Sequence, residues 1–369
     1  MPRFIAYYLP QYHPISENDL WWGKGFTEWT NVVKAKPFFK EHYQPRYPAD
    51  LGYYDLRVPE IREQQATIAG DYGLEGFIYY HYWFGNGRVL LERPFQDVLN
   101  SKKPNFPFCL CWANENWRGA WFGEFTNKLL IEQKYAGKKD YEKHFYYLLP
   151  AFLDERYIKV DGKPVFNVYM PLNLPNIKEF SDIFNELAIR EGLPGMFLVG
   201  SRCSLNWNPS ENNFDGVIGS EISAINFKEY NTIKKKSYST KLFQKNVAKI
   251  FPALNEKFLK KMPVVVEYAD VIDRLITDKV FDFDYYPCVV PNWDNTPRAE
   301  EKGLVFHNSS PELFYKQLKK AIDKVSYLPE KRKFIFIKSW NEWAEGNYLE
   351  PDKKFGYQYL EQILKAVNE

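Results

Sequence analysis

The chain has 369 residues, enough for one large α/β barrel or for two ordinary domains. Hydrophobic residues make up 45% of it and charged residues 26%, as in ordinary globular proteins. With 49 basic and 47 acidic residues the net charge is only +2, so charge gives no case for nucleic-acid binding. The aromatic content of 18% is high, and such side chains either build a core or line a carbohydrate-binding groove.

The cysteines and the start of the chain predict the compartment. Cys109, Cys111, Cys203 and Cys288 each lie in an apolar, strand-like run, and no histidine spacing completes a zinc site. We therefore expect buried free thiols, as in a reducing compartment. Met1 leads almost directly into a strand without an apolar leader, and no run of 18 apolar residues follows. These features predict a cytoplasmic protein, and we expect no metal or organic cofactor.

Taken in order, the chain alternates short apolar runs with helical patterns. Eight runs are predicted to be strands: residues 4–9, 76–83, 106–112, 164–170, 196–200, 215–219, 285–290 and 334–338. Six stretches have helical patterns: residues 59–72, 92–102, 140–157, 177–191, 311–324 and 358–367. Near-continuous apolar strands are typical of a parallel sheet buried on both faces. The pattern predicts one α/β domain, residues 1–369, folded as a (β/α)8 TIM barrel with long loops.

Two stretches are longer than a simple crossover needs. Residues 11–54 form an aromatic loop with several prolines, and a structureless loop of that length is usually functional. Residues 222–284 are predicted to be an insertion between strands six and seven, serving as a lid or small subdomain. This insertion is rich in lysine between Lys228 and Lys261. A solvated helical excursion and a phosphate- or membrane-facing patch, such as a contact with a lipid-linked glycan, are equally consistent with that charge.

Polar and aromatic residues gather just after the C-terminal ends of the predicted strands, which is where a barrel places its active site. They are His81, Trp83, Trp112, Asn114, Glu115, Glu221, Trp293, Asp294, Glu342 and Glu345. Some positions remain ambiguous, because adjacent side chains on a strand point to opposite faces. Only one residue of a pair such as Tyr7 and Tyr8, or Tyr80 and His81, can point into the barrel mouth.

The last predicted strand leads into the sequence Ser-Trp-Asn-Glu-Trp-Ala-Glu-Gly at residues 339–346. If the chain turns there, Glu342 and Glu345 lie on one side, with Cβ atoms about 5–6 Å apart. Two carboxylates that close do not both ionise easily, so one serves as acid and the other as base. Glycosidic bond cleavage needs such a pair. The alternative is a surface pair at a helix start, but the preceding strand and the flanking Trp340 and Trp343 favour the catalytic interpretation.

Two further clusters follow other strands. Glu115 lies between Trp112 and Trp117, and we expect it to bind sugar hydroxyls, with an ion pair to Arg118 as the structural alternative. After strand seven, Trp293 could stack on a sugar ring and Asp294 could orient a hydroxyl, although the same residues could form an Asx turn.

Metal and nucleotide sites are not supported by the motifs. The Asp282-Phe283-Asp284 sequence precedes strand seven and so belongs at the opposite end of the barrel, which argues against a metal site. Gly-rich phosphate loops are absent from the sequence.

Five separated motifs resemble the WbsX family, whose members are often labelled glycosyltransferases of surface-polysaccharide gene clusters. They are residues 6–13, 25–29, 111–117, 293–296 and 339–346, reading AYYLPQYH, GFTEW, CWANENW, WDNT and SWNEWAEG. The resemblance spans nearly the whole chain. The WbsX family is related to glycoside hydrolase family 99, whose members are (β/α)8 retaining endo-mannosidases with a similar N-E-W-x-E-G motif.

This resemblance implies roles for the two glutamates. Glu342 would act as a base on the sugar's own 2-hydroxyl, which displaces the leaving group and gives a 1,2-anhydro sugar. Glu345 would be the general acid and then the base that activates water. The chain departs from the pattern at Ala344, where the hydrolases commonly have His, and at residues 118–123, where WbsX proteins more usually have a run like W-T-R-R-W-D-G.

The sequence thus predicts a glycoside hydrolase family 99-like enzyme that cleaves a polysaccharide or its precursor, or transfers part of it, with retention and with Glu342 and Glu345 as catalytic residues. A glycosyltransferase of lipopolysaccharide or capsular polysaccharide biosynthesis and a non-catalytic glycan-binding barrel are the alternatives. The expected partner is an oligosaccharide or polysaccharide and not a nucleic acid. The substrate-binding candidates are Tyr8, Trp29, His81, Trp83, Trp112, Asn114, Glu115, Trp117, Glu221, Trp293, Asp294, Trp340, Asn341 and Trp343.

Overall fold

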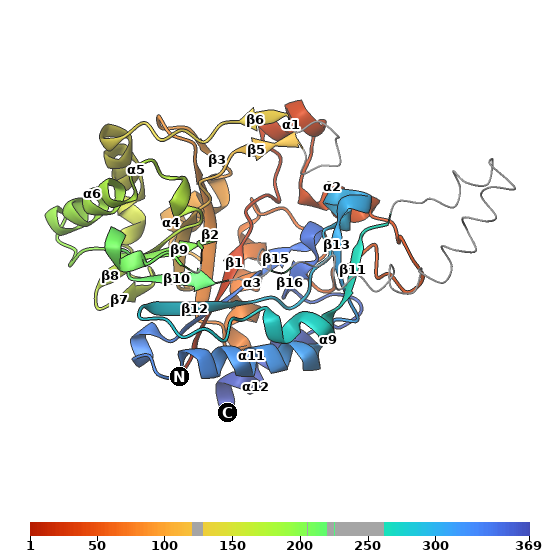
Figure 1. The fold of residues 1–369 in the computed structure, drawn as a ribbon. Helices are drawn as coiled ribbons and strands as arrows, with labels where there is room; N and C mark the ends of the chain where they lie inside the picture. The colour runs from red at the N-terminus through yellow and green to blue at the C-terminus, as the bar shows by residue number, and fades with distance from the viewer. Residues whose placement is uncertain (120–127, 205, 220–224, 226–261) are drawn as a thin grey trace, which may run out of the picture.

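The computed structural model describes residues 1–119, 128–204, 206–219, 225 and 262–369 (Figure 1). Eight parallel strands form its centre: β1 (Arg3–Tyr8), β2 (Gly76–Trp83), β4 (Phe108–Trp112), β8 (Lys163–Val168), β9 (Phe197–Ser201), β10 (Gly216–Gly219), β12 (Asp284–Val289) and β14 (Phe334–Ile337). The first strand, β1, pairs with both β2 and β14, so the sheet closes on itself. The predicted (β/α)8 barrel is confirmed, with each strand within two residues of its expected bounds.

The six helices expected from the sequence cover the barrel. They are α3 (Pro59–Asp71), α4 (Arg93–Ser101), α5 (Lys138–Phe152), α6 (Ile177–Arg190), α11 (Pro311–Val325) and α12 (Gln358–Asn368). The two termini lie at one end of the barrel, beside α11 and α12 (Figure 1). At the other end lie α1 (Ser16–Trp22) and the hairpin of β5 (Trp117–Arg118) and β6 (Leu129–Ile131).

The sequence suggested a structureless loop for residues 11–54, but this segment contains helices. It contains α1 and α2 (Glu28–Lys34). A capping box starts α2, in which the Thr27 backbone N–H donates to Thr30 Oγ1 at 3.2 Å and the Thr27 side chain accepts from the third residue of the helix. Helical pairing satisfies backbone groups that a buried loop would leave unpaired, which lets this segment pack against the barrel mouth.

The predicted insertion of residues 222–284 lies largely outside the described residues, and so does its lysine-rich part. Its described end forms β11 (Val264–Glu267) and α9 (Tyr268–Val271). The strand β11 pairs in parallel with β13 (Leu304–His307), away from the barrel sheet. Val266, Tyr268 and Phe306 are buried there in a small second core.

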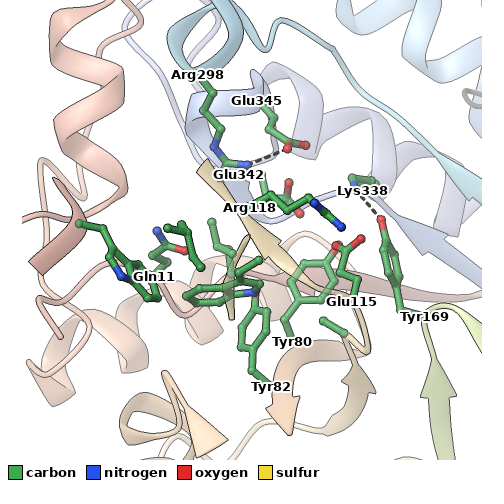
Figure 2. A pocket seen from close by; sticks show the side chains of 15 residues that line it. Gln11, Tyr80, Tyr82, Glu115, Arg118, Tyr169, Arg298, Lys338, Glu342 and Glu345 are labelled. Carbon is green, nitrogen blue, oxygen red and sulfur yellow. Dashed lines mark hydrogen bonds and ion pairs between the residues drawn. The ribbon is translucent and has the colours of Figure 1, made fainter. Parts of the chain in front are cut away.

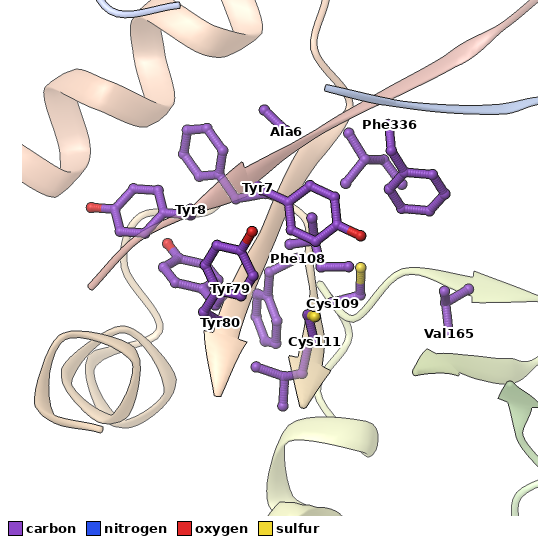
Figure 3. Packing of buried hydrophobic residues seen from close by; sticks show 14 of the residues in the cluster. Ala6, Tyr7, Tyr8, Tyr79, Tyr80, Phe108, Cys109, Cys111, Val165 and Phe336 are labelled. Carbon is purple, nitrogen blue, oxygen red and sulfur yellow. The ribbon is translucent and has the colours of Figure 1, made fainter. Parts of the chain in front are cut away.

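Side chains alternate between the barrel interior and the helical layer, and this alternation decides what faces the site (Figure 3). The ring of Tyr7 stacks on Tyr80 at 5.2 Å and lies 6.1 Å from Phe336 inside the barrel. The next residue along β1, Tyr8, instead packs against Tyr79 on the helical side, where Tyr79 contacts Phe95 of α4. The parity of a residue within its strand therefore determines whether it reaches the barrel mouth.

The start of β2 lies close to the backbone of Pro107, just before β4, and this contact gives a test of the packing. An added Cβ at Gly76 would lie 2.4 Å from the carbonyl oxygen of Pro107, so Gly76→Ala requires backbone movement. We expect the free energy of unfolding to fall by about 1–3 kcal/mol, measured by chemical denaturation. The matched variant Gly70→Ala, on α3, meets only the Phe106 ring at 3.5 Å and should not destabilise the fold. Equal stability of the two variants would contradict this packing.

Candidate active site

A cavity opens at the C-terminal ends of the barrel strands (Figure 2). Its lining residues are Leu9, Gln11, Trp21, Tyr80, Tyr82, Ala113, Glu115, Trp117, Arg118, Leu130, Tyr169, Arg298, Lys338, Glu342 and Glu345. They come from β2 and from the segments that follow β1, β4, β8, β12 and β14, together with α1 and the β5–β6 hairpin. Three carboxyl groups and several aromatic rings therefore meet in one hollow, a composition typical of a small-molecule site.

A tight turn presents the two glutamates to this cavity. Glu342 ends the short strand β15 (Asn341–Glu342), and Glu345 ends a 3-10 turn that runs from Trp343. Gly346 follows with φ of 63°, and an added Cβ there would lie 2.8 Å from the backbone nitrogen of Asp294. Only glycine fits both the left-handed backbone and the close approach, which explains the Gly that closes the Glu-x-x-Glu motif.

The two glutamates form an unequal pair. Glu342 is 4% exposed and Glu345 is 7% exposed, and their carboxyl groups share a hydrogen bond. Burial raises the pKa of Glu342 to about 8 and the neighbouring Glu345 adds to this rise, against the opposing effect of Lys338. Burial alone would also raise the pKa of Glu345, but Arg298 and Lys338 hold it below its usual value. At neutral pH the shared proton therefore resides on Glu342.

Arg298 is the group that separates the two pKa values. Its Nη1 donates to Glu345 Oε1 at 2.7 Å, and its Nε donates to Glu28 Oε1 at 3.0 Å. A second hydrogen bond joins Arg298 Nη2 to the same oxygen of Glu28. Glu28 is fully buried at the start of α2, and burial raises its pKa against the pull of Arg298. One guanidinium thus connects the first long loop to the turn that carries Glu342 and Glu345.

Asp294 holds the far side of the turn. It is fully buried, and its Oδ2 accepts from Gln44 Nε2 at 2.7 Å and lies 2.8 Å from His42 Nε2. Its backbone N–H donates to the Glu345 carbonyl at 2.7 Å, while Arg46 donates to the Gly346 carbonyl at 3.0 Å. Burial would raise the pKa of Asp294, but the hydrogen bond with His42 and the charge of Arg46 lower it. In this structure Asp294 holds the turn and does not line the cavity.

A second buried carboxyl supports the turn from below. Glu350 accepts hydrogen bonds from Trp343 Nε1 at 2.6 Å, Tyr54 Oη at 2.9 Å and Gln65 Nε2 at 2.6 Å. Burial raises the pKa of Glu350 to about 7 in spite of these donors. The amide of Asn341 makes two hydrogen bonds to the backbone of Leu9, of 2.7 and 3.1 Å, and so ties the turn to the end of β1.

Four of the residues that the sequence singled out line the cavity: Glu115, Trp117, Glu342 and Glu345. Burial raises the pKa of Glu115, while Arg202 and Lys338 lower it. The half-buried Trp117 ring packs edge-to-face against Tyr82 at 5.2 Å.

Four other candidates point outward into the helical layer. The hydroxyl of Tyr8 donates to Gln65 of α3 at 2.6 Å. His81 makes a 2.9 Å hydrogen bond to His144 of α5, and burial lowers the pKa of His81 to about 3. Trp83 stacks on His144 at 4.7 Å, and Trp112 Nε1 donates to the Trp83 carbonyl at 2.9 Å. These residues have the wrong strand parity to reach the cavity, and the structure gives them packing contacts.

A third group builds the walls behind the site. Trp29 contacts Trp343 at 5.5 Å, and Trp340 is fully buried against Phe77 at 5.1 Å. The side chain of Asn114 bridges to the backbone of Met170, with hydrogen bonds of 2.8 Å in both directions.

Trp293 and Glu221 complete the set of candidates. Trp293 is half-buried and packs against the second core, with its ring centroid 5.6 Å from Lys338 Nζ, and it does not line the cavity. Glu221 lies outside the described residues.

Sequence reasoning missed two cations of the site, Arg298 and Lys338, and the buried carboxylate of Glu28 that Arg298 binds. Arg298 follows the Trp-Asp-Asn-Thr motif by two residues, Glu28 lies within Gly-Phe-Thr-Glu-Trp, and Lys338 directly precedes the last motif. Their nearness to these motifs was the available signal. Tyr169 and Gln11 follow β8 and β1, and only their place at strand ends could have indicated them.

Metal and membrane features can be stated only for the described part of the chain. There, no group of three or more His, Cys, Asp or Glu side chains is arranged to hold a metal ion. Within the same residues, no helix has the length and apolar character needed to cross a membrane.

Comparison with known proteins identifies relatives along the full chain. A family model described as "Glycosyltransferase WbsX" matches residues 4–363. Proteins called WxcX from two strains of Xanthomonas campestris pv. campestris, themselves uncharacterized, are 34% identical over 364 residues. The alignment covers 98% of this chain but 49% of each relative, so the chain spans about half the length of these proteins.

Solved structures share the fold at low sequence identity. A GH99 endo-alpha-mannosidase from Bacteroides thetaiotaomicron superposes with a TM-score of 0.59 at 14% identity, covering 99% of this chain and 96% of the enzyme. A glycoside hydrolase-like protein superposes with a TM-score of 0.54 at 15% identity, covering 99% and 93%. These likenesses establish the TIM-barrel fold.

Removal of Arg298 tests the ion-pair arrangement. Arg298→Met leaves Glu28 and Glu345 buried without their counterion, which we expect to cost about 3–5 kcal/mol of unfolding free energy. The control Arg57→Met removes an exposed arginine that pairs with Asp55 at 2.7 Å, and it should cost no more than about 1 kcal/mol. Chemical denaturation of both variants measures the difference. Equal losses would show that Arg298 does not hold the two carboxylates in the folded protein.

The raised pKa of Glu350 gives a pH dependence with a defined sign. Because the folded state holds this proton more tightly than the unfolded state, the resulting stability is present below pH 4.5 and is lost as pH rises through about 7. The stability of the wild type relative to Glu350→Gln should therefore fall by about 1.4 kcal/mol per pH unit within this window. Denaturation of both proteins from pH 4.5 to 8 measures it. A difference that stays constant with pH would contradict the assignment.

Proposed function

The chain belongs to the WbsX glycosyltransferase family, and from this premise we propose that it is a carbohydrate-active enzyme that cleaves or transfers a glycosidic bond at Glu342 and Glu345. The observation that carries the proposal is the buried, hydrogen-bonded glutamate pair with unequal proton affinity in an aromatic-lined cavity. One protonated and one ionised carboxyl group are the two partners that glycosidic chemistry requires at neutral pH.

The charges around the pair favour one assignment of roles. Glu342 retains its proton and is suited to protonate the departing oxygen, while Glu345 is kept ionised by Arg298 and is suited to act as base. This is the reverse of the order that the resemblance to family 99 implies. The reversal is part of our proposal and follows from the ion pair between Arg298 and Glu345, whose 2.7 Å hydrogen bond favours the ionised form of that carboxyl.

The closeness of the pair favours retention of configuration. An inverting enzyme seats a water molecule between its carboxyl groups, which are about 6.5–9.5 Å apart. Glu342 and Glu345 are neighbours in one tight turn and each shifts the pKa of the other, so we propose a pair too close to seat that water. Two adjacent carboxyl groups are instead placed to act on neighbouring oxygens of one sugar, the glycosidic oxygen and the 2-hydroxyl.

In the first step that we propose, Glu345 takes the proton of the 2-hydroxyl and O2 attacks C1. The bond from C1 to the leaving group breaks, and Glu342 gives its proton to the departing oxygen. In the second step Glu342 takes a proton from the incoming hydroxyl, whose oxygen attacks C1. The C1–O2 bond opens and Glu345 returns a proton to O2. The incoming hydroxyl belongs to water in hydrolysis and to a second sugar in transfer.

Transfer is the second candidate, because the family description names a glycosyltransferase. The same two steps then join a donor glycan to an acceptor, which suits synthesis of a surface polysaccharide such as lipopolysaccharide or capsule. Product analysis with and without an added acceptor sugar separates the two outcomes.

Substitution of each glutamate tests both the site and the roles. Glu342→Gln and Glu345→Gln should each lower kcat/KM on natural glycans by about 10²–10⁴-fold, because acid or base assistance is lost. A substrate with a good leaving group, such as a nitrophenyl glycoside, needs no acid. It should restore the first step in Glu342→Gln and leave Glu345→Gln impaired.

The exposed Glu361→Gln on α12 is the control and should keep full activity. If the nitrophenyl glycoside rescues Glu345→Gln and not Glu342→Gln, Glu345 is the acid, as the resemblance to family 99 implies. Full activity of both site variants would remove Glu342 and Glu345 from the proposed site. A wild type that is inactive on every tested glycan would favour the non-catalytic glycan-binding alternative.

A further inference from the structure

Near one wall of the cavity lie two cations, Lys338 and Arg202. Lys338 is close enough to lower the pKa of both Glu342 and Glu345, but among the described residues neither cation makes a direct ion pair with that pair of glutamates. Lys338 follows β14, and its Nζ lies 3.5 Å from the hydroxyl of Tyr169 and 5.8 Å from the centroid of that ring (Figure 2). Among the described residues, no carboxylate oxygen lies within ion-pair distance of this ammonium. Within the described protein, the ammonium of Lys338 therefore donates one long hydrogen bond, to Tyr169, and it faces the hollow.

Arg202 adds a second cation to the same wall. It follows β9, and its guanidinium lies 5.6 Å from the Tyr169 ring centroid. Within the described part of the chain, its ion pair is with Glu115 at 4.0 Å, the limit for such a contact. The backbone of Arg202 is left-handed, with φ of 48°, a conformation that costs energy in a non-glycine residue and is found at functional sites.

The carboxylates of the site do not balance these charges. Arg298 binds both Glu345 and Glu28, and it lies on the side of the cavity away from Tyr169 (Figure 2). The raised pKa of Glu342 favours its neutral form, so Lys338, which lines the cavity, and Arg202, which lies beside Tyr169 outside the lining, face the carboxylate of Glu115. Burial of a cation costs free energy unless a hydrogen-bond acceptor or an opposite charge pairs with it. A bound ligand can supply that partner.

We propose that the sugar unit seated against Tyr169 carries an anionic group, such as the carboxylate of a uronic acid or a phosphate ester, which Lys338 and Arg202 bind. This inference rests on the proposed function, because it assumes that the cavity holds a sugar. A neutral sugar would also accept hydrogen bonds from the ammonium, but it would leave the excess positive charge of this wall unpaired.

Binding of small glycosides tests the inference without requiring turnover. Ligand-observed NMR titration of the wild type compares methyl glucuronide and methyl galacturonide with methyl glucoside and methyl galactoside, and the corresponding 6-phosphates form a third arm. We expect the anionic members of either the carboxylate or the phosphate arm to bind about tenfold or more tightly than their neutral partners. The preference should weaken as salt is added.

Two variants assign that preference to residues. Lys338→Met should abolish it, and Arg202→Met, at the exposed rim, should reduce it even if the first variant folds poorly. The control Lys331→Met lies just before β14, at its other end, where Lys331 pairs with Asp161 at 2.7 Å, and it should leave the preference intact.

The outcomes separate this inference from the function on which it rests. Equal binding of anionic and neutral glycosides, or a preference that survives in Lys338→Met, overturns the inference and leaves the glycan-active site in place. Failure of the wild type to bind any glycoside overturns both.

Discussion

The ion pair between Arg298 and Glu345, shared with the buried Glu28, is the interaction on which the rest of the site depends. It places one positive charge between two carboxylates that burial would otherwise neutralise. Because Arg298 favours the ionised form of Glu345, the proton shared by the pair moves to Glu342. A single guanidinium thereby gives two chemically identical side chains different proton affinities, as the proposed acid and base roles require.

This arrangement requires a rigid turn, and much of the mouth of the barrel serves to hold it. Asp294 binds the turn from β12, Asn341 ties it to the end of β1, and Glu350 anchors the Trp343 ring below it. The contacts come from segments far apart in the sequence, so a misplaced loop would move the carboxyl groups. The buried carboxyl groups of Asp294 and Glu350 each accept several hydrogen bonds, as buried polar networks require.

The barrel was predictable because its strands are short apolar runs with helical patterns between them, and burial on both faces leaves this imprint in the sequence. The glutamate pair was predictable because one turn brings both carboxyls to one side. Strand parity was not predictable at Tyr8, His81 and Trp83, since apolar runs without polar alternation do not show which residues face inward. Arg298 and Glu28 meet across 270 residues of chain, a contact that no local pattern predicts.

The aromatic motifs that link this chain to its family thus have a structural meaning. Trp29, Trp340 and Trp343 are at most 7% exposed and pack behind the catalytic turn, so their resemblance to the family concerns how the turn is held. Tyr169 and Lys338 face the hollow but lie outside those motifs. The turn that holds the glutamates and the proposed anion-binding wall are therefore built from separate residues, so the two can change independently on the fold shared with the GH99 enzyme.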